Sequence, residues 1–276
     1  MSFPSDSNTS DRISEMFHKL QKISRPALIP FVPAGWPEFD ATLEIVKTVE
    51  KAGADAIELG LPFSDPLADG VTNQNAYYEA IQQGTNTSTV LETVSLIRKE
   101  GIQFPIIVMG YFNPIFAYGS ARWVKDAKEA GVDALIVVDL PPGESYELEA
   151  AAKNSELHLI YLVAPTSNSE RLKHVANYAS GFLYCVSLTG TTGARSELSS
   201  GLPDFIDRVR EYVDLPLAIG FGISERKHVE EVGKLADAAI IGSAFVRTIS
   251  EASLEERSIE IVKFIRQMKG EDSDIS

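Results

Sequence analysis

One stretch of the sequence, residues 58–70, combines an acidic residue inside an apolar strand with two more in the following loop. Strand alternation turns Glu58 to the opposite face from its apolar neighbours. Such a glutamate is costly to bury unless its charge is paired, relayed or removed by a raised pKa. Asp65 and Asp69 lie in a proline-bracketed loop at the same strand end. One dry, protonated carboxyl beside one solvated, ionised carboxylate is what acid/base catalysis requires.

The same residues also fit a purely structural role. Glu58 could be a buried side chain tied to backbone donors, while Asp65 and Asp69 stabilise turns next to proline and glycine. Polar loop residues are most often simply solvated. The stretch by itself therefore leaves the catalytic and the structural interpretations balanced, and the rest of the chain must decide between them.

Composition limits the classes of protein and partner. The chain has 276 residues, 44% of them hydrophobic, which suits one large α/β domain, since barrels of about 250 residues are routinely single domains. A net charge of −14 argues against nucleic acid or an anionic membrane as the main partner. No apolar run approaches the roughly 20 residues of a membrane span. A small anionic substrate remains possible, bound through backbone amides.

The ends and the single thiol complete this picture. Residues 1–10 predict a disordered lead-in without a targeting signal, residues 11–269 a single domain, and residues 270–276 a disordered acidic tail. Cys185, the only cysteine, lies in an apolar strand and is expected to be a small core residue. Without internal disulfides the chain is compatible with a reducing, cytoplasmic setting.

The body of the chain alternates apolar strand candidates with amphipathic helix candidates. The strands are predicted at 27–32, 56–61, 106–110, 134–140, 158–164, 181–187, 217–222 and 238–242. The helices are predicted at 40–52, 89–99, 121–130, 144–153, 169–179, 203–212, 225–235 and 253–269, with an extra N-terminal helix at 11–22. Strands apolar on both faces and separated by helices predict a (β/α)8 TIM barrel with an extra N-terminal helix. A flat doubly wound sheet is the alternative, but no G-x-G-x-x-G follows the first strand.

The connections after the strands carry the unusual residues, as expected for the catalytic face of a barrel. These connections span 62–72, 112–118, 165–168, 188–202 and 222–224. Glycines at 220–222 and at Gly242-Ser243 follow the last two strands, where phosphate sites recur in such barrels. The hydroxyl-rich connection 188–202 predicts a lid. The short turns before strands two and four, ending in Asp55 and Asp133, are expected to stabilise the opposite face.

The sequence lacks the residues that several types of catalysis require. No lysine lies within a predicted strand, which disfavours a Schiff-base aldolase. His158 is expected at a strand start and the other histidines on helix surfaces, and none has metal-ligand spacing, so no metal is expected. Walker A, G-x-S-x-G and nicotinamide fingerprints are missing. A phosphorylated substrate processed by carboxylates remains.

Residues 27–246 resemble the tryptophan synthase alpha subunit family. The most specific stretch is ELGLPFSDPLADG at 58–70, and MGYFNP at 109–114, S-x-x-G-x-T-G-A-R at 187–195 and GFGIS at 220–224 also match. The resemblance implies retro-aldol cleavage of indole-3-glycerol phosphate into indole and glyceraldehyde 3-phosphate. Glu58 would protonate indole C3 and take a proton from the glycerol hydroxyl. Asp69 would accept the indole N–H.

The resemblance also implies the binding residues and the partner. Indole would pack among Phe31, Met109, Ile136, Leu162 and Tyr184, and phosphate would bind Gly193, Gly222, Gly242 and Ser243. Thr192 would position Asp69, and Phe221 and Ile223 would be either pocket walls or core. The partner would be a pyridoxal-phosphate β subunit in an α2β2 complex, contacted by Asp65 and Pro66. This chain itself would carry no cofactor.

Some positions depart from the family pattern. Val71 and Asn73 stand where the family usually has proline and an apolar residue, and nothing explains the bulk of Leu188 at the lid junction. Two other functions stay open. Another phosphate-binding barrel enzyme would need a strand lysine or a differently placed Asp/Cys pair, and a non-catalytic companion of a β subunit would not need Glu58 and Asp69.

Overall fold

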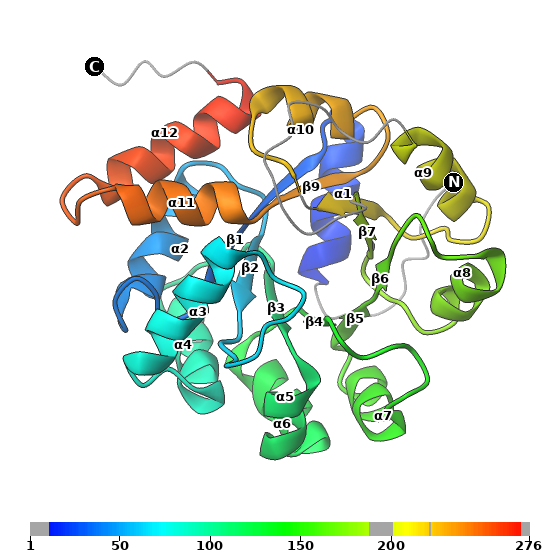
Figure 1. The fold of residues 1–276 in the computed structure, drawn as a ribbon, viewed down its shortest axis with the longest axis horizontal. Helices are drawn as coiled ribbons and strands as arrows, with labels where there is room; N and C mark the ends of the chain where they lie inside the picture. Colours follow the sequence, from blue (N-terminus) through cyan, green and yellow to red (C-terminus); the bar gives the residue numbers. More distant parts are fainter. Residues whose placement is uncertain (1–10, 188–200, 221, 272–276) are drawn as a thin grey trace.

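Short apolar strands pair in parallel to form one sheet that closes on itself (Figure 1). The computed structural model describes residues 11–187, 201–220 and 222–271. Its strands are β1 (Ala27–Pro33), β2 (Ile57–Gly60), β3 (Ile106–Gly110), β4 (Ala134–Val137), β5 (His158–Ile160), β6 (Leu162–Val163), β7 (Leu183–Val186), β8 (Leu217–Gly220) and β9 (Ala238–Ile241). Their order in the sheet is β5-β4-β3-β2-β1-β9-β8-β7-β6.

The two edges of this sheet belong to one run of chain. Only Tyr161 separates β5, which pairs with β4, from β6, which pairs with β7. Each predicted strand is present, and the fifth is divided where it changes neighbour. The predicted (β/α)8 barrel is therefore confirmed, and the single strand predicted at 158–164 is present as two short strands, β5 and β6.

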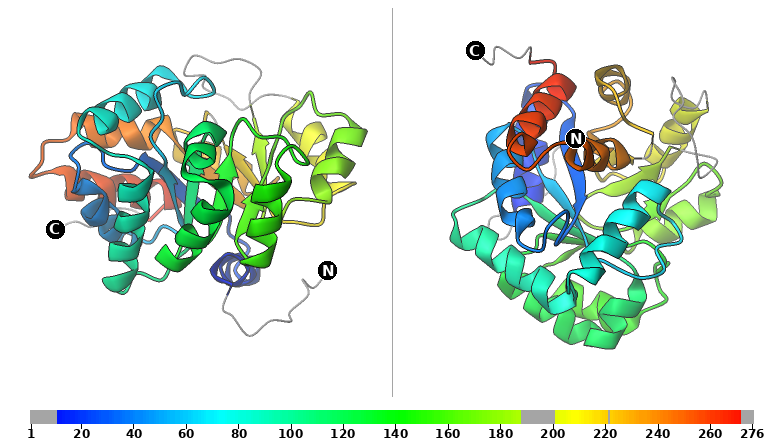
Figure 2. Two further views of the ribbon diagram at one scale, coloured as in Figure 1. Left: turned by 90° about the horizontal axis from the view of Figure 1, so that it is seen from below. Right: turned by 60° about the vertical axis from the view of Figure 1, so that its left-hand side comes forward.

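Helices surround the barrel in the expected alternation. They are α1 (Arg12–Lys22), α2 (Ala41–Lys51), α3 (Val71–Gln82), α4 (Thr87–Lys99), α5 (Phe112–Tyr118), α6 (Ser120–Ala130), α7 (Tyr146–Asn154), α8 (Ser169–Ala176), α9 (Leu202–Arg210), α10 (Arg226–Val232), α11 (Ser243–Glu251) and α12 (Arg257–Lys269). The predicted N-terminal helix is α1, capped by the Asp11 carboxylate, which accepts from the amides of Ile13 and Ser14. In the left view of Figure 2, α1 (dark blue) lies at one end of the barrel and α3 (cyan) lies at the other.

Helices α3, α5 and α11 were not among the predicted elements. Helix α3 begins at the end of the connection predicted at 62–72, α5 coincides with the connection predicted at 112–118, and α11 begins directly after Gly242. Helix α3 buries only Ala76, Tyr77 and Ala80, so its amphipathic signal is weak. Helix α11 buries Phe245, Val246 and Ile249, a helical spacing that could have revealed it.

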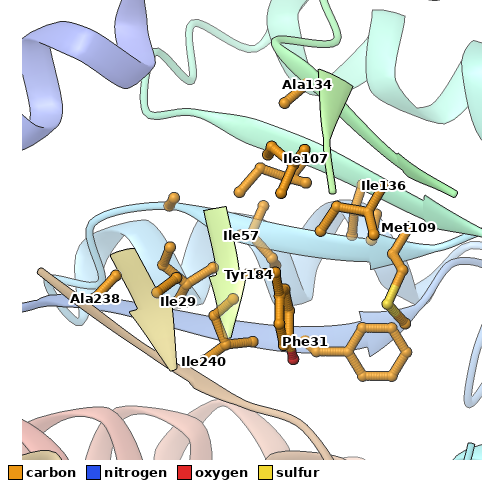
Figure 3. Close-up of a cluster of buried hydrophobic side chains, with 14 of the residues drawn as sticks. Ile29, Phe31, Ile57, Ile107, Met109, Ala134, Ile136, Tyr184, Ala238 and Ile240 are labelled. Carbon is orange, nitrogen blue, oxygen red and sulfur yellow. The ribbon is translucent and has the colours of Figure 1, made fainter. Parts of the chain in front are cut away.

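Strand register sets which side chains face the barrel interior. Phe31 is level with Glu58, and Glu58 with Ile107 on the next strand. Two residues further along β3, towards the carboxyl ends of the strands, Met109 is level with Ile136. Side chains level on adjacent parallel strands point to the same face. Glu58 therefore sits in a layer whose neighbours are apolar, as the cluster in Figure 3 illustrates.

The only thiol belongs to this packed interior. Cys185 in β7 is fully buried between its strand neighbours Val163 and Ile219. Burial raises the pKa of the Cys185 thiol to about 12. The thiolate is therefore essentially unpopulated at neutral pH, and the expected core role of this residue is what the structure shows.

A repeated Asp–Arg arrangement ties the opposite end of the barrel together. Asp55, Asp133 and Asp237 each precede a strand and accept the backbone N–H of a residue at the start of a neighbouring strand, at 2.8 to 2.9 Å. Each also pairs with an arginine: Arg25, Arg98 and Arg210 respectively. Asp133 additionally binds Arg12 of α1. These carboxylates join successive strands through backbone and side chain together.

Replacing Asp133 with alanine should destabilise the fold strongly, because the Arg98 side chain is only 11% exposed and would lose its main countercharge. We expect a loss of about 3–5 kcal/mol in the free energy of unfolding, measured with urea. The matched control is Asp237→Ala, which also removes a backbone acceptor but leaves an arginine that is 42% exposed. That pair should contribute about 1 kcal/mol or less through charge. Equal losses in the two variants would contradict the interpretation.

Candidate active site

Glu58 is a buried acid without a hydrogen-bond partner for one of its oxygens. It lies on β2, is 1% exposed, and its Oε2 has no partner in the part of the chain that the structure describes. Burial, with the charge of Asp69 as a smaller contribution, raises the pKa of Glu58 from 4.5 to about 8. The carboxyl is thus protonated at neutral pH and can donate a proton to a bound molecule.

Asp69 is partly buried, but unlike Glu58 Oε2 both of its carboxylate oxygens have hydrogen-bond donors. The Tyr111 hydroxyl donates to Oδ2 at 2.6 Å, and the Asn73 amide donates to Oδ1 at 3.2 Å. Tyr111 in turn accepts the backbone N–H of Ala68 at 3.0 Å, which fixes the loop. Burial raises the pKa of Asp69, whereas the bonds from Tyr111 and Asn73 oppose that rise and favour the ionised form. Asp69 also immediately precedes Gly70, the N-cap of α3, where a negative charge is stabilised.

The sequence reasoning did not find Tyr111, Asn73 or Tyr77 as functional candidates. Tyr111 is separated from Asp69 by 42 residues, so only the fold brings them together. Tyr77 is fully buried on α3, and its ring meets that of Phe31 edge-on at 6.1 Å between centroids. The motif M-G-Y-F-N-P, which contains Tyr111, was the one available signal.

Two glycines on the strands let aromatic rings approach the backbone closely. A Cβ on Gly60 would lie 2.6 Å from the Tyr77 hydroxyl and 2.9 Å from the Phe31 ring. A Cβ on Gly220 would lie 2.0 Å from the Tyr184 hydroxyl. No side chain fits at either position without moving the ring. Both glycines therefore determine where the aromatic walls stand.

The side chains expected to pack around indole come together on the inner face. Phe31, Met109, Ile136 and Tyr184 lie within one buried cluster (Figure 3). Leu162 is level with Tyr184 on the neighbouring strand and packs against the same core. The layer that contains Glu58 is thus bounded by apolar and aromatic groups, which exclude water from the acid.

The expected phosphate-binding residues lie at the ends of neighbouring strands. Gly220 on β8 is level with Ile240 on β9, so Gly222 and Gly242 each follow by two residues. Gly222 has a φ of +80° and open space where a Cβ would be, while Gly242 caps α11 and Ser243 begins it. Ile223 is buried in the core. Thr192, Gly193 and Phe221 lie outside the described residues.

A histidine that the sequence placed on a helix surface is instead buried. His228 on α10 is 1% exposed, because its ring packs inward behind the connection after β8. Its Nδ1 accepts the backbone N–H of Ser224 at 3.2 Å. The surface prediction for His228 was therefore wrong. The ring restrains the connection that contains Gly222 and Ile223.

The loop between Glu58 and Asp69 presents a face to solvent. Asp65 is exposed and accepts a hydrogen bond from the Ser64 hydroxyl, whereas Pro66 is buried beneath it. Leu67, an apolar side chain in the same loop, is 86% exposed. The residues expected to contact a partner thus belong to the same short segment as the ionised carboxylate.

Two cavities elsewhere do not involve these carboxylates. One of about 990 Å³ lies beside α7 and is lined in part by Lys128, Lys153 and His158. Another of about 550 Å³ lies between α3 and α11 and includes Trp36 and Glu79. Neither is lined by the two carboxylates, so the site is identified by its acid/base groups and strand register instead of by the size of a hollow.

The described residues contain no cluster of three or more His, Cys, Asp or Glu side chains that could hold a metal ion. No helix within 11–187, 201–220 and 222–271 is both long and apolar enough to span a membrane.

A closed parallel barrel with a buried glutamic acid on β2 and a hydrogen-bonded aspartate in the connection after it has the arrangement of the barrel enzymes, whose active sites lie on this face. A family model described as tryptophan synthase alpha chain matches residues 17–273. The chain belongs to the tryptophan synthase alpha chain family. Its activity is that of a carbon–carbon lyase that cleaves indole-3-glycerol phosphate and passes indole to a β subunit.

Individual relatives agree over nearly the whole chain. The tryptophan synthase alpha chain of Roseiflexus sp. (strain RS-1) is 48% identical over 259 residues, which cover 94% of this chain and 99% of the relative. That of Citrifermentans bemidjiense is 47% identical over 258 residues, which cover 94% of this chain and 96% of the relative. The solved tryptophan synthase subunit alpha from Legionella pneumophila superimposes with a TM-score of 0.85 at 32% identity, covering 95% of this chain and 98% of that one.

Replacing Tyr111 with phenylalanine should move the acid limb of the pH–activity profile to higher pH. The variant removes the 2.6 Å donor that favours ionised Asp69, so the pKa of Asp69 should rise and more of it would be protonated at a given pH. The measurement is kcat/KM for indole formation between pH 5 and 9. Tyr118→Phe, which removes a hydroxyl bound to Asp126, is the matched control. An unmoved acid limb in Tyr111→Phe would contradict this role.

Proposed function

We propose that Glu58 and Asp69 are the acid/base pair that cleaves indole-3-glycerol phosphate in this chain. The observation that carries the proposal is the contrast between their environments. Glu58 is buried with a pKa of about 8, and Asp69 accepts two hydrogen bonds that favour its charged form. One group therefore holds a proton at neutral pH while the other holds a negative charge.

The reaction follows from these two states. Glu58 donates its proton to indole C3, which turns the ring into a good leaving group and develops positive charge at the ring nitrogen. Asp69 accepts the indole N–H and stabilises that charge. The Glu58 carboxylate then removes the proton of the hydroxyl next to the ring as the bond from C3 breaks. The bond electrons return to the ring, an aldehyde forms, and Glu58 regains its proton.

The binding groups act around this pair. Phe31, Met109, Ile136, Leu162 and Tyr184 enclose the indole ring and exclude water. The phosphate binds backbone and hydroxyl groups of Gly222, Gly242 and Ser243 at the start of α11, where N–H groups are free to receive an anion. Gly193 completes that group, Thr192 positions Asp69, and Phe221 and Ile223 close the pocket or belong to the core.

The remaining features concern the complex and its setting. The chain works as one domain over residues 11–269 and without a cofactor of its own, since its carboxylates supply both proton transfers. Pyridoxal phosphate belongs to the β subunit, which receives indole within an α2β2 complex. The loop that contains Asp65 and Pro66 contacts that subunit, because Asp65 and Leu67 are exposed on it although Pro66 is buried. The complex is cytoplasmic.

Replacing Glu58 with glutamine should lower turnover by about 10²- to 10⁴-fold, because glutamine cannot transfer a proton. The measurement is indole release from indole-3-glycerol phosphate, with and without β subunit. Glu92→Gln, an exposed residue on α4, is the matched control and should keep full activity. Near-normal cleavage by Glu58→Gln would remove the assignment. Activation of a β subunit without any indole formed by the unmodified chain would indicate a non-catalytic companion.

The same variant should become relatively more stable as pH rises. The folded pKa of Glu58, about 8, lies above its ordinary value of 4.5, so between these pH values folding retains a proton that the unfolded chain releases. Stability of the unmodified chain therefore falls across this window. Urea unfolding at pH 5 and pH 8 should show the difference between Glu58→Gln and wild type shifting in favour of the variant by on the order of 3 kcal/mol. A pH-independent difference would contradict the raised pKa.

A further inference from the structure

Asn73 occupies a position between the ionised carboxylate and the expected phosphate site. It is the third residue of α3, and its amide nitrogen lies 3.2 Å from Asp69 Oδ1. The same nitrogen lies 3.8 Å from the point that a Cβ on Gly242 would occupy, beside the Phe31 ring. The side chain of Asn73 thus lies between the connection after β2, which carries Asp69, and the end of β9, which Gly242 follows.

The orientation of the Asn73 amide is set by its partner. An ionised carboxylate only accepts hydrogen bonds, so the NH₂ group must face Asp69 and the carbonyl oxygen must face away. Oδ1 of Asn73 is buried and has no hydrogen-bond partner among the described residues. A buried acceptor in this state costs free energy unless a donor reaches it. The amide that carries this acceptor has its nitrogen near both Asp69 and Gly242, the groups expected to bind the two ends of the substrate.

The chemistry of the substrate supplies one suitable donor. Under the proposed function, on which this inference rests, the indole N–H binds Asp69 and the hydroxyl next to the ring binds Glu58. The second hydroxyl of the glycerol chain lies one carbon nearer to the phosphate and has no assigned partner. The Asn73 amide nitrogen lies near both Asp69 and Gly242, so we expect this side chain beside the part of the substrate that carries the second hydroxyl.

We propose that Asn73 is a substrate-binding and positioning residue that holds Asp69 through its NH₂ group and accepts a hydrogen bond from the phosphate-proximal hydroxyl of the glycerol chain. This residue stands where the family pattern usually has an apolar side chain. An apolar side chain offers neither bond. The chain therefore recognises the polyol part of its substrate with a group additional to the two carboxylates.

The test compares two ligands that cannot be cleaved because they lack the hydroxyl next to the ring. The probes are 3-(indol-3-yl)propyl phosphate and its 2-hydroxy derivative, which differ only in the phosphate-proximal hydroxyl. Their dissociation constants are measured by calorimetry on the full chain. The wild type should prefer the hydroxylated probe about five- to tenfold, as expected for one neutral hydrogen bond.

Substitutions then locate the origin of that preference. Asn73→Leu, of nearly equal shape, should reduce the preference to about onefold, whereas Asn73→Asp keeps an acceptor oxygen and should retain it. Any effect of the new charge on phosphate cancels in the ratio of the two probes. Asn75→Leu, exposed on the same helix, is the control and should keep the wild-type ratio.

Two results would overturn the proposal. Equal binding of both probes by the wild type would exclude the hydroxyl contact, even if Asn73→Leu failed to fold. An unchanged preference in folded Asn73→Leu would assign the hydroxyl to another group. Because these are equilibrium ratios, they do not depend on whether Glu58→Gln retains turnover, so this inference and the proposed catalytic roles fail separately.

Discussion

The burial of Glu58 without a full set of hydrogen bonds is the constraint on which the rest of the site depends. An acid in this state stays protonated only while the apolar layer around it excludes water and cations. That layer includes Phe31 and Ile107, its level neighbours on the adjacent strands. The barrel therefore maintains a locally unfavourable group, which is typical of functional sites. At the far end of the barrel, Asp55, Asp133 and Asp237 join strands through paired charges and backbone bonds.

The difference in pKa between the two carboxyl groups comes from their hydrogen bonds and not from burial alone. Burial raises the pKa of both groups. Among the described residues, Tyr111 and Asn73 donate to Asp69 while Glu58 Oε2 has no donor, and Asp69 also stands at the start of a helix. The hydrogen bonds thereby favour the charged form of Asp69, whereas burial favours the neutral form of Glu58. The loop that carries Asp69 owes its position to Tyr111 as well, through the Ala68 amide.

Much of the fold could be predicted because its pattern is local and repeated. Each strand is a short apolar run, and glycine–aspartate turns precede the predicted strands at 56–61 and 134–140. Helix α3 could not be predicted, since Val71 to Gln82 buries mostly small residues and its polar first turn reads as loop. The break at Tyr161 depends on which neighbour each half-strand finds, which is a property of the closed sheet.

The acids of the site could be predicted from the sequence, whereas their contacts could not. Glu58 and Asp69 stand out as acids in one motif, but the contacts that distinguish them join residues far apart in sequence. Tyr111 reaches Asp69 across 42 residues, and His228 turns inward to hold the Ser224 amide. No periodicity within one segment encodes such a contact. The sequence therefore indicated the two acids that we propose as reacting groups, and it did not indicate the side chains that contact and restrain their loops.

The buried thiol of β7 has a consequence for observing the molecule in motion. Cys185 is the chain's sole cysteine and is sealed between β6 and β8. An alkylating reagent can reach it only after those strands separate. Modification kinetics at this one atom would consequently count spontaneous openings of the barrel wall, with no engineered label and no competing signal from a second sulfhydryl.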